Sequence, residues 1–282
     1  MSAPVAIVCG GGGFPLAVAD AARRAGREVF LVGLHGAADP DIAAFPHIWL
    51  KLGEFGKLFR ALAERDIRSL AIVGNLTRPD FSDLRLDFGG VKRLPDIARI
   101  LRGGDDHALR GVVRFFEDEG FAVLGAHELA PALLIGEGLV TRRAPDEAAR
   151  EDIAMGLALG DGLSPFDCGQ AVIVAGRRVV AVEAAEGTDA MIQRVGQLRA
   201  SGKLRLKGRA GVLVKAPKRG QDLRVDLPAI GPRTIAAAAD AELAGVALAA
   251  GGVLVLERAA LAAEADRAGL FLVGVAPRPT GP

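Results

Sequence analysis

The sequence lacks tyrosine altogether, and it has only two cysteines and no long block of like charges. Cys9 and Cys168 are far apart and form no CxxC spacing, which argues against a disulfide framework or a thiolate metal site. The 35 basic and 34 acidic residues give a net charge of +1, without the basic surface of a nucleic-acid-binding protein. We therefore expect a reducing compartment and no nucleic-acid partner.

Long apolar runs and several familiar catalytic motifs are also missing. No stretch of about 18 apolar residues is free of charges or glycines, so we expect no transmembrane helix. The opening residues 1–4 have neither the basic nor the apolar region of a signal peptide. We expect a cytoplasmic protein whose membrane contact is peripheral. GxSxG, HExxH and Walker motifs are absent, so Ser/His/Asp catalysis has no support.

Strand and helix patterns alternate through the first half of the chain. Residues 4–9 are a continuous apolar run that ends in glycines, which is typical of a strand buried on both faces. Pro15 fits the first turn of a helix that ends near Gly26, and residues 28–32 predict the next strand. Residues 69–73 predict a third buried strand, and further alternation as far as Leu124 predicts a mostly parallel sheet. The sequence thus indicates a Rossmann-like domain over residues 1–130.

The second half has a mixed pattern. Prolines and scattered glycines mark a linker region over residues 131–165, which contains one predicted helix. Two short apolar runs flank Ala175-Gly176-Arg177, a hairpin signal. Residues 252–256 predict a strand, residues 257–268 a helix and residues 270–275 a further strand. The fold class is therefore α/β, with an N-terminal parallel-sheet domain and a C-terminal mixed α/β domain over residues 166–282.

A glycine run at residues 10–13 connects the first predicted strand to its helix. Glycines allow backbone N–H groups to approach a phosphate at a helix N-terminus, although a tight turn without a ligand is the alternative. The spacing is not GxGxxG, and Gly33-Leu34-His35 stands where a dinucleotide site has its acidic residue. An NAD(P)-dependent oxidoreductase is therefore the weaker reading of this loop.

Polar residues at three further loops suggest ligand contacts, each with a structural alternative. Asn75 and Arg78 follow the third predicted strand, where an amide and a guanidinium suit a nucleotide or a phosphate. Asp105 and Asp106 precede a helix and suit either a divalent cation or helix capping. Thr188 begins a later helix, whose free N–H groups could bind a phosphate, although taken alone the residue favours capping.

The densest group of charges follows a buried apolar run near residue 215. Lys215, Lys218 and Arg224 suit the neutralisation of phosphate charge. Asp222 and Asp226 suit a metal ion or the activation of a water molecule. Asp222, Arg224 and Asp226 would share one face of an extended chain, and a solvated surface strand is the alternative reading.

Four segments, in the same order, resemble the LpxI family of UDP-2,3-diacylglucosamine pyrophosphatases of lipid A synthesis. The most specific is Lys-Arg-Gly-Gln-Asp-Leu-Arg-Val-Asp-Leu-Pro over residues 218–228, followed by Gly-Pro-Arg-Thr-Ile over 231–235. The others are the Gly-Gly-Gly-Gly-Phe-Pro-Leu loop over 10–16, Gly-Gly-Asp-Asp over 103–106 and Glu-Gly-Thr-Asp over 186–189. The resemblance runs along almost the whole chain.

The resemblance implies hydrolysis of UDP-2,3-diacylglucosamine to UMP and 2,3-diacylglucosamine 1-phosphate, with Mg²⁺ or a similar divalent cation. It implies a catalytic aspartate within the Gln-Asp-x-Arg-x-Asp segment, which we assign to Asp226 first and Asp222 second. Expected partners are the lipid-linked nucleotide sugar and, transiently, the inner membrane surface; a homodimer stays open. A non-catalytic nucleotide-sugar binding protein is the alternative. The expected substrate-binding residues are Gly11, Gly12, Gly13, Asn75, Arg78, Thr188, Lys215, Lys218, Gln221 and Arg224, and the expected metal ligands are Asp222, Asp226, Asp105 and Asp106.

Overall fold

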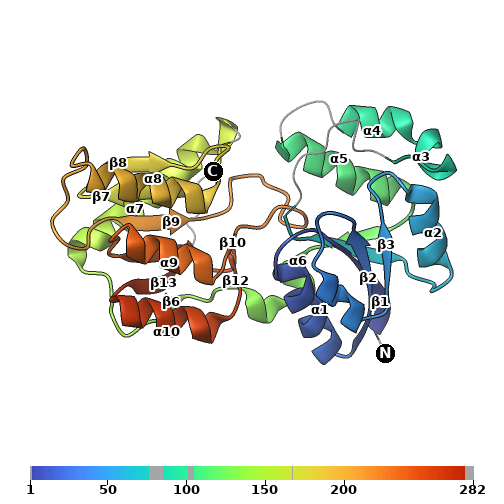
Figure 1. Ribbon diagram of the computed structural model, residues 1–282, viewed down its shortest axis with the longest axis horizontal. Helices are drawn as coiled ribbons and strands as arrows, with labels where there is room; N and C mark the ends of the chain where they lie inside the picture. Colours follow the sequence, from blue (N-terminus) through green and yellow to red (C-terminus); the bar gives the residue numbers. More distant parts are fainter. Residues whose placement is uncertain (1, 76–84, 101–104, 167, 277–282) are drawn as a thin grey trace. The chain divides into compact units, whose positions relative to one another are not determined.

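The computed structural model describes residues 2–75, 85–100, 105–166 and 168–276 (Figure 1). The chain forms two compact units. Unit 1 comprises residues 1–132 together with Asp222–Asp226, and unit 2 comprises residues 133–221 and 227–282. Unit 1 is therefore discontinuous in sequence, because a short segment from the second half of the chain belongs to it.

Unit 1 contains a sheet in which all strands are parallel, in the order β3-β2-β1-β4-β5. The strands are β1 (Ser2–Cys9), β2 (Arg27–Leu34), β3 (His47–Leu50), β4 (Ser69–Val73) and β5 (Ala122–Leu124). The helices are α1 (Phe14–Arg24), α2 (Phe55–Ala63), α3 (Phe88–Lys92), α4 (Leu94–Ile100), α5 (Asp105–Asp118), α6 (Ala126–Leu129) and the short 3₁₀ helix η1 (Pro40–Ala44). The parallel sheet expected from the sequence is confirmed.

Helices cover both faces of this sheet, which explains why its strands are apolar throughout. On one face, Ala6 and Val8 of β1 pack in a core that includes Leu62 of α2 and Phe116 of α5. The alternate β1 residues point to the other face, where α1 and α6 lie in contact (Figure 1). Strand order reverses between β1 and β4, so the loops after these two strands meet at the carboxyl edge of the sheet.

Unit 2 contains a mixed sheet in the order β6-β13-β11-β9-β7-β8. β9, β11 and β13 are parallel, whereas β7 is antiparallel to both β9 and β8. The strands are β6 (Gly138–Leu139), β7 (Ala171–Ala175), β8 (Arg178–Val182), β9 (Val212–Lys215), β11 (Gly245–Ala249) and β13 (Phe271–Val275), with a separate pair, β10 (Ala229–Ile230) and β12 (Leu254–Val255). The mixed α/β character and the β7–β8 hairpin are confirmed.

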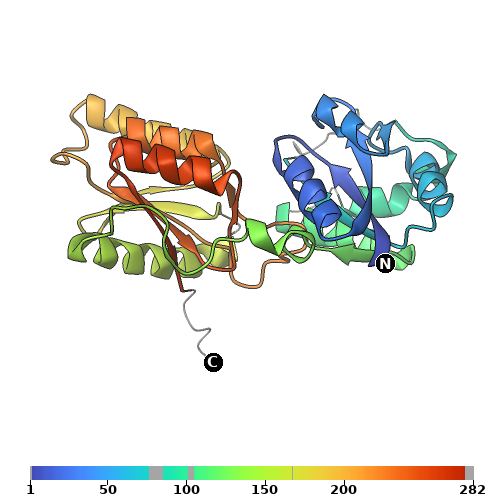
Figure 2. The ribbon, with the colours of Figure 1, turned by 90° about the horizontal axis from the view of Figure 1, so that it is seen from below.

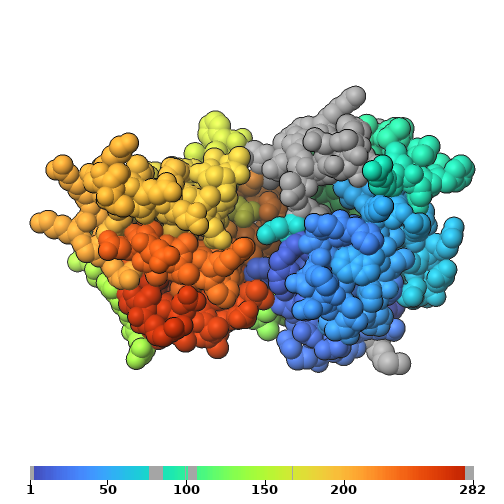
Figure 3. All heavy atoms as spheres, viewed as in Figure 1, coloured from blue at the N-terminus to red at the C-terminus, as the bar shows by residue number. Residues whose placement is uncertain are grey.

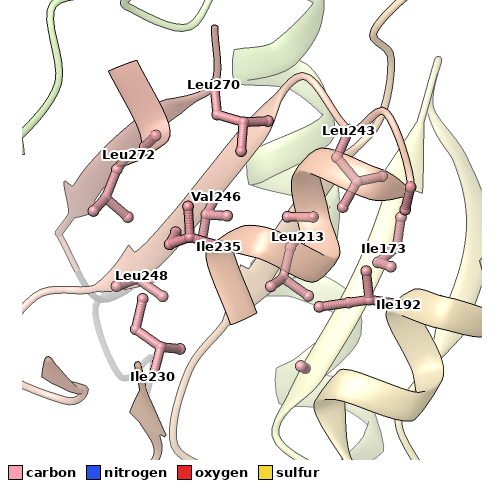
Figure 4. Packing of buried hydrophobic residues seen from close by; sticks show 14 of the residues in the cluster. Ile173, Ile192, Leu213, Ile230, Ile235, Leu243, Val246, Leu248, Leu270 and Leu272 are labelled. Carbon is pink, nitrogen blue, oxygen red and sulfur yellow. The ribbon is translucent and has the colours of Figure 1, made fainter. Parts of the chain in front are cut away.

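The helices of unit 2 are α7 (Glu147–Leu163), α8 (Thr188–Ala200), α9 (Pro232–Asp240), α10 (Arg258–Ala268) and the 3₁₀ helix η4 (Ser164–Phe166). The 3₁₀ helix η3 (Pro131–Leu133) spans the sequence boundary between the two units. Figure 2 shows α7 on the opposite face of the sheet from α9 and α10. Figure 4 shows Ile192 of α8 beside Leu213 of β9, and Ile235 of α9 beside Val246 of β11. This two-sided core fixes the direction of β8 and β9, whose ends carry the polar residues described below.

Candidate active site

The loops after β1 and β4 are joined by a pair of backbone hydrogen bonds. The N–H of Gly11 donates to the carbonyl of Asn75 at 2.7 Å, and the N–H of Asn75 donates to the carbonyl of Gly11 at 2.9 Å. A Cβ on Gly10 would lie 2.7 Å from the Asn75 carbonyl oxygen and 2.9 Å from the Gly74 carbonyl carbon. Glycine is therefore required at position 10 for the two loops to approach, and two predicted site residues, Gly11 and Asn75, lie side by side.

The rest of the glycine run leads into the start of α1. Gly12 has a φ of +87°, a conformation that glycine adopts without strain. Gly13 is the N-cap, and no side chain caps the first turn, which carries a proline as predicted. Gly12 and Gly13 are both exposed. An uncapped helix start with exposed N–H groups suits an anion. Arg78, also predicted here, lies outside the described residues.

Asp222–Asp226 forms a turn on unit 1 rather than the extended strand considered from the sequence. The N–H of Asp226 donates to the carbonyl of Asp222 at 3.1 Å, four residues back. Val225 packs against the core that α2 and α5 share. The period-two arrangement of charges on one face of a strand therefore does not occur, because the backbone folds back at this point.

Within this turn, Arg224 is held between two carboxylates. Its Nε and Nη2 donate to the two oxygens of Asp222 at 2.9 and 2.7 Å, and its Nη1 donates to Glu117 of α5 at 2.7 Å. The Arg224 backbone N–H also donates to Asp222 Oδ1 at 3.1 Å. Hydrogen bonding from Arg224 lowers the pKa of Asp222, against the opposing effect of burial, and raises the pKa of Arg224. Asp222 is therefore an ionised partner of Arg224, which anchors the turn to α5.

The end of β5 leaves room for this turn because residue 125 is glycine. A Cβ on Gly125 would lie 3.2 Å from the Arg224 Cα and 2.3 Å from Cε1 of His127. The ring of His127 thus lies against the Gly125 backbone, and its Nδ1 is buried without a hydrogen-bond partner among the described residues. β5 is parallel to β4, so the turn lies at the carboxyl edge of the sheet.

In unit 2, a buried lysine and a buried glutamate are connected through a threonine. Lys215 ends β9 and is 6% exposed, and Glu183 follows β8 and is 8% exposed. The ammonium group of Lys215 donates to Thr188 Oγ1 at 2.7 Å, and the Thr188 hydroxyl donates to Glu183 Oε1 at 2.9 Å. β8 and β9 run in the same direction, since both are antiparallel to β7. Their carboxyl ends therefore place these groups at one edge of the sheet.

The remaining predicted residues of unit 2 lie in the turn that follows β9. The backbone N–H of Lys218 donates to the side-chain oxygen of Gln221 at 2.8 Å, which closes the turn. Nearby in sequence, Arg219 is paired with Asp161 of α7 at 3.1 Å. Lys218 and Gln221 are both half-buried. The Lys218–Gln221 turn thus connects Lys215, at the end of β9, to the Asp222–Asp226 segment in the sequence.

The structure thus sorts the predicted site residues into two groups. Unit 1 carries Gly11, Gly12, Gly13, Asn75, Asp222, Arg224 and Asp226, and unit 2 carries Thr188, Lys215, Lys218 and Gln221. Asp105 and Asp106 begin α5, but their side chains lie outside what the structure describes.

Two residues in these groups were missed from the sequence. Glu183 could have been found from its position at the end of a predicted strand before a helix, the same rule that pointed to Asn75. Glu117 had no local signal, because its partner Arg224 is 107 residues away.

Fold and site together define an α/β protein in which glycine loops, lysines and aspartates gather at the carboxyl edges of two sheets. That is where α/β proteins bind phosphorylated ligands. The LpxI N-terminal domain matches residues 4–133, and the LpxI C-terminal domain matches residues 136–273. The chain therefore belongs to the LpxI family.

A curated relative extends this match over nearly the full length of both proteins. The UDP-2,3-diacylglucosamine pyrophosphatase LpxI of Caulobacter vibrioides is 42% identical over 272 residues, which cover 96% of this chain and 97% of the relative. Among solved structures, the NAD complex of Thermus thermophilus UDP-glucose 4-epimerase is 16% identical. That alignment covers 99% of this chain and 88% of the epimerase with a TM-score of 0.30, too low to support a shared fold or a shared ligand.

Proposed function

We propose that this chain hydrolyses the pyrophosphate bond of UDP-2,3-diacylglucosamine, yielding UMP and 2,3-diacylglucosamine 1-phosphate. The observation that carries the proposal is the 42% identity, over 96% of the chain, to a protein named for that activity. In the reaction, the oxygen of one water adds to a phosphorus, and the bridging oxygen leaves with the other phosphate. The protein must therefore neutralise the anhydride and orient the water.

The charges at the two carboxyl edges suit that task. Lys215 and Lys218 of unit 2 would bind phosphate oxygens, and the glycine run with Asn75 of unit 1 would bind the nucleotide or its phosphates. Asp226 would act on the attacking water or hold the cation. Arg224, which the sequence suggested as a phosphate ligand, is instead engaged by Asp222 and Glu117. We therefore assign Arg224 to anchoring the turn that carries Asp226.

A divalent cation fits this site only with help from the substrate. No group of three or more His, Cys, Asp or Glu side chains among the described residues is arranged as a complete set of metal ligands. Asp222 is engaged by Arg224. We propose Asp226, the first choice from the resemblance, as the carboxylate of this segment that would bind Mg²⁺. Mg²⁺ commonly binds through one or two carboxylates plus substrate phosphates. When bound, it would supply positive charge that stabilises the phosphate oxygens during attack.

Turnover with and without a chelator tests the proposal. The purified chain, given UDP-2,3-diacylglucosamine and Mg²⁺, is expected to release UMP and 2,3-diacylglucosamine 1-phosphate, and excess chelator should abolish the release. Chromatography of both products provides the measurement. If both products are still released in excess chelator, the reaction needs no divalent cation. Tight UDP-sugar binding without any product would instead indicate a nucleotide-sugar binding protein.

A substrate with two acyl chains also implies contact with a lipid surface. No helix of the described residues is long and apolar enough to span a bilayer. Phe88, Val91 and Leu94 in α3 and α4 are nevertheless 78%, 55% and 40% exposed, and Lys92 Nζ lies 4.8 Å above the Phe88 ring. Figure 3 shows this teal segment on the surface. Exposed apolar side chains next to a lysine suit an anionic bilayer, and we propose this face as the point of contact.

Vesicle co-sedimentation tests that contact. The double variant Phe88→Ser/Val91→Ser is expected to bind vesicles containing anionic phospholipid about tenfold more weakly, because it removes apolar area from the contact. Phe166→Ser is the matched control, since Phe166 is 71% exposed but lies in unit 2. Equal weakening by both variants, or by neither, would contradict the assignment of this face.

A further inference from the structure

Few polar side chains are buried in the described part of the chain, and only three of them carry a charge. These are Asp152, Glu183 and Lys215. Asp152 has a structural task, because its carboxylate accepts the backbone N–H groups of Gly176 and Arg177 in the β7–β8 hairpin at 2.9 and 2.6 Å. Glu183 and Lys215 lie at the ends of β8 and β9.

The threonine between them fixes the direction of each hydrogen bond. Lys215 can only donate, so Thr188 Oγ1 accepts its proton at 2.7 Å. The single hydroxyl proton of Thr188 then goes to Glu183 Oε1 at 2.9 Å. The other oxygen of Glu183 accepts the backbone N–H of Gln170 at 3.0 Å. Thr188 therefore has no hydroxyl proton left for a phosphate in this arrangement.

The backbone beside Glu183 is shaped to admit its side chain. A Cβ on Gly169 would lie 2.2 Å from Glu183 Cγ, so glycine at this position makes room for the carboxylate stem. The N–H of Gly169 donates to the Glu183 carbonyl at 3.0 Å, and the N–H of Glu183 donates to the Ala171 carbonyl at 2.9 Å. Glu183 is thus held in place by its backbone and by both of its carboxylate oxygens.

We propose that Glu183 is a positioning residue that acts on Lys215 through Thr188. A buried ammonium group without a nearby negative charge is unfavourable and tends to lose its proton. Glu183 supplies a negative charge one hydroxyl away from Lys215 and orients that hydroxyl. The ammonium group of Lys215 is thereby oriented at the sheet edge. This inference rests on the proposed function, in which Lys215 binds a substrate phosphate.

Steady-state kinetics of Glu183→Gln test the proposal. Glutamine keeps the size and an acceptor oxygen but removes the charge, so KM is expected to rise about tenfold with a smaller change in kcat, as for a weakened phosphate contact. Asp152→Asn is the matched control: it also neutralises a buried carboxylate of unit 2, but it should leave KM unchanged and lower only the melting temperature. A KM for Glu183→Gln equal to that of the wild type would overturn the proposal.

A double-mutant cycle separates positioning from a merely structural role. If Glu183 acts through Lys215, Glu183→Gln/Lys215→Met should lose no more activity than Lys215→Met alone. Thr188→Val should resemble Glu183→Gln, and Thr188→Ser should recover most of the loss. Additive losses in the double variant would overturn the proposal. An inactive wild-type chain would overturn the proposed function itself, whereas an active wild type with additive losses would overturn only the role of Glu183.

Discussion

Asp226→Asn is expected to lower kcat for UDP-2,3-diacylglucosamine by about 10²- to 10⁴-fold, the range for loss of a positioned acid–base group. Asparagine has nearly the same shape as aspartate but cannot accept a proton from water and binds a cation weakly. The turn should survive, because it is closed by the backbone N–H of residue 226 and by the Arg224 ion pairs. UMP release under saturating substrate measures the loss, and thermal unfolding checks the fold.

The adjacent variant Asp222→Asn distinguishes chemistry from anchoring. Asp222 accepts hydrogen bonds from Nε and Nη2 of Arg224, so its neutralisation should loosen the turn. The expected loss of activity is smaller than that of Asp226→Asn. Asp118→Asn, at the exposed end of α5, controls for the loss of a nearby surface charge. The opposite ranking would assign the chemistry to Asp222. Near-normal kcat in both variants would show that neither Asp222 nor Asp226 takes part in the reaction.

Gly10→Ala is expected to lower the free energy of unfolding by about 1–3 kcal/mol, the usual cost of forcing an extra carbon into a packed site. The new Cβ would lie 2.7 Å from the Asn75 carbonyl oxygen and 3.0 Å from the Gly74 carbonyl oxygen. Both contacts are with backbone, so no side-chain rotation relieves them. The loops after β1 and β4 must then separate. Urea denaturation measures the stability, and KM for the substrate should rise as the loops move.

A second glycine variant controls for the general effect of alanine on the unfolded chain. Gly160 lies in α7, and a Cβ at this position would have nothing within 4 Å, so Gly160→Ala should be neutral or slightly stabilising. If Gly10→Ala leaves both stability and KM at wild-type values, then the Gly11–Asn75 hydrogen bonds do not depend on the close approach of the two loops, and the steric argument fails.

Elements with distinctive local patterns could be predicted from the sequence. The residues of β4 were predicted without error, and Pro15 was correctly assigned to the first turn of α1. The hairpin at Gly176 and the start of α8 at Thr188 were also predicted correctly. In each case the signal lies within a few residues: a continuous apolar run, a fixed φ, a turn glycine or a residue type typical of a helix start. The capping role considered for Thr188 was wrong, because Gly187 is the N-cap of α8 and no side chain caps the helix.

Elements whose stability comes from distant partners were missed. β11 has the sequence Gly-Val-Ala-Leu-Ala, which is poor in β-branched residues, yet it lies between β9 and β13 at the centre of its sheet. The sequence reading placed the strand at residues 252–256 instead, where only the short β12 forms, outside the main sheet. Burial on both faces outweighs weak strand propensity in a central strand, and no local pattern reports it.

The features of the candidate site also divide into those with a local signal in the sequence and those that depend on distant residues. Residue types and loop positions led to Lys215, Asp222 and Asp226 as candidates, and their roles stay predictions. They could not show that Arg224 would be engaged by two carboxylates, because Glu117 comes from α5, far along the chain. Nor could they show that Thr188 has its one proton directed to Glu183. Hydrogen-bond assignment depends on which neighbours the fold supplies, and sequence spacing does not contain that information.

The discontinuity of unit 1 has a consequence for how the protein is made. Asp222–Asp226 belongs to this unit, where Val225 packs on its core and Arg224 pairs with Glu117 of α5. A ribosome synthesises that segment only after residues 133–221. In nascent unit 1, the part of the core that Val225 covers therefore stays exposed until Asp226 has emerged from the exit tunnel. The first unit to be started cannot be completed before much of the second has been translated.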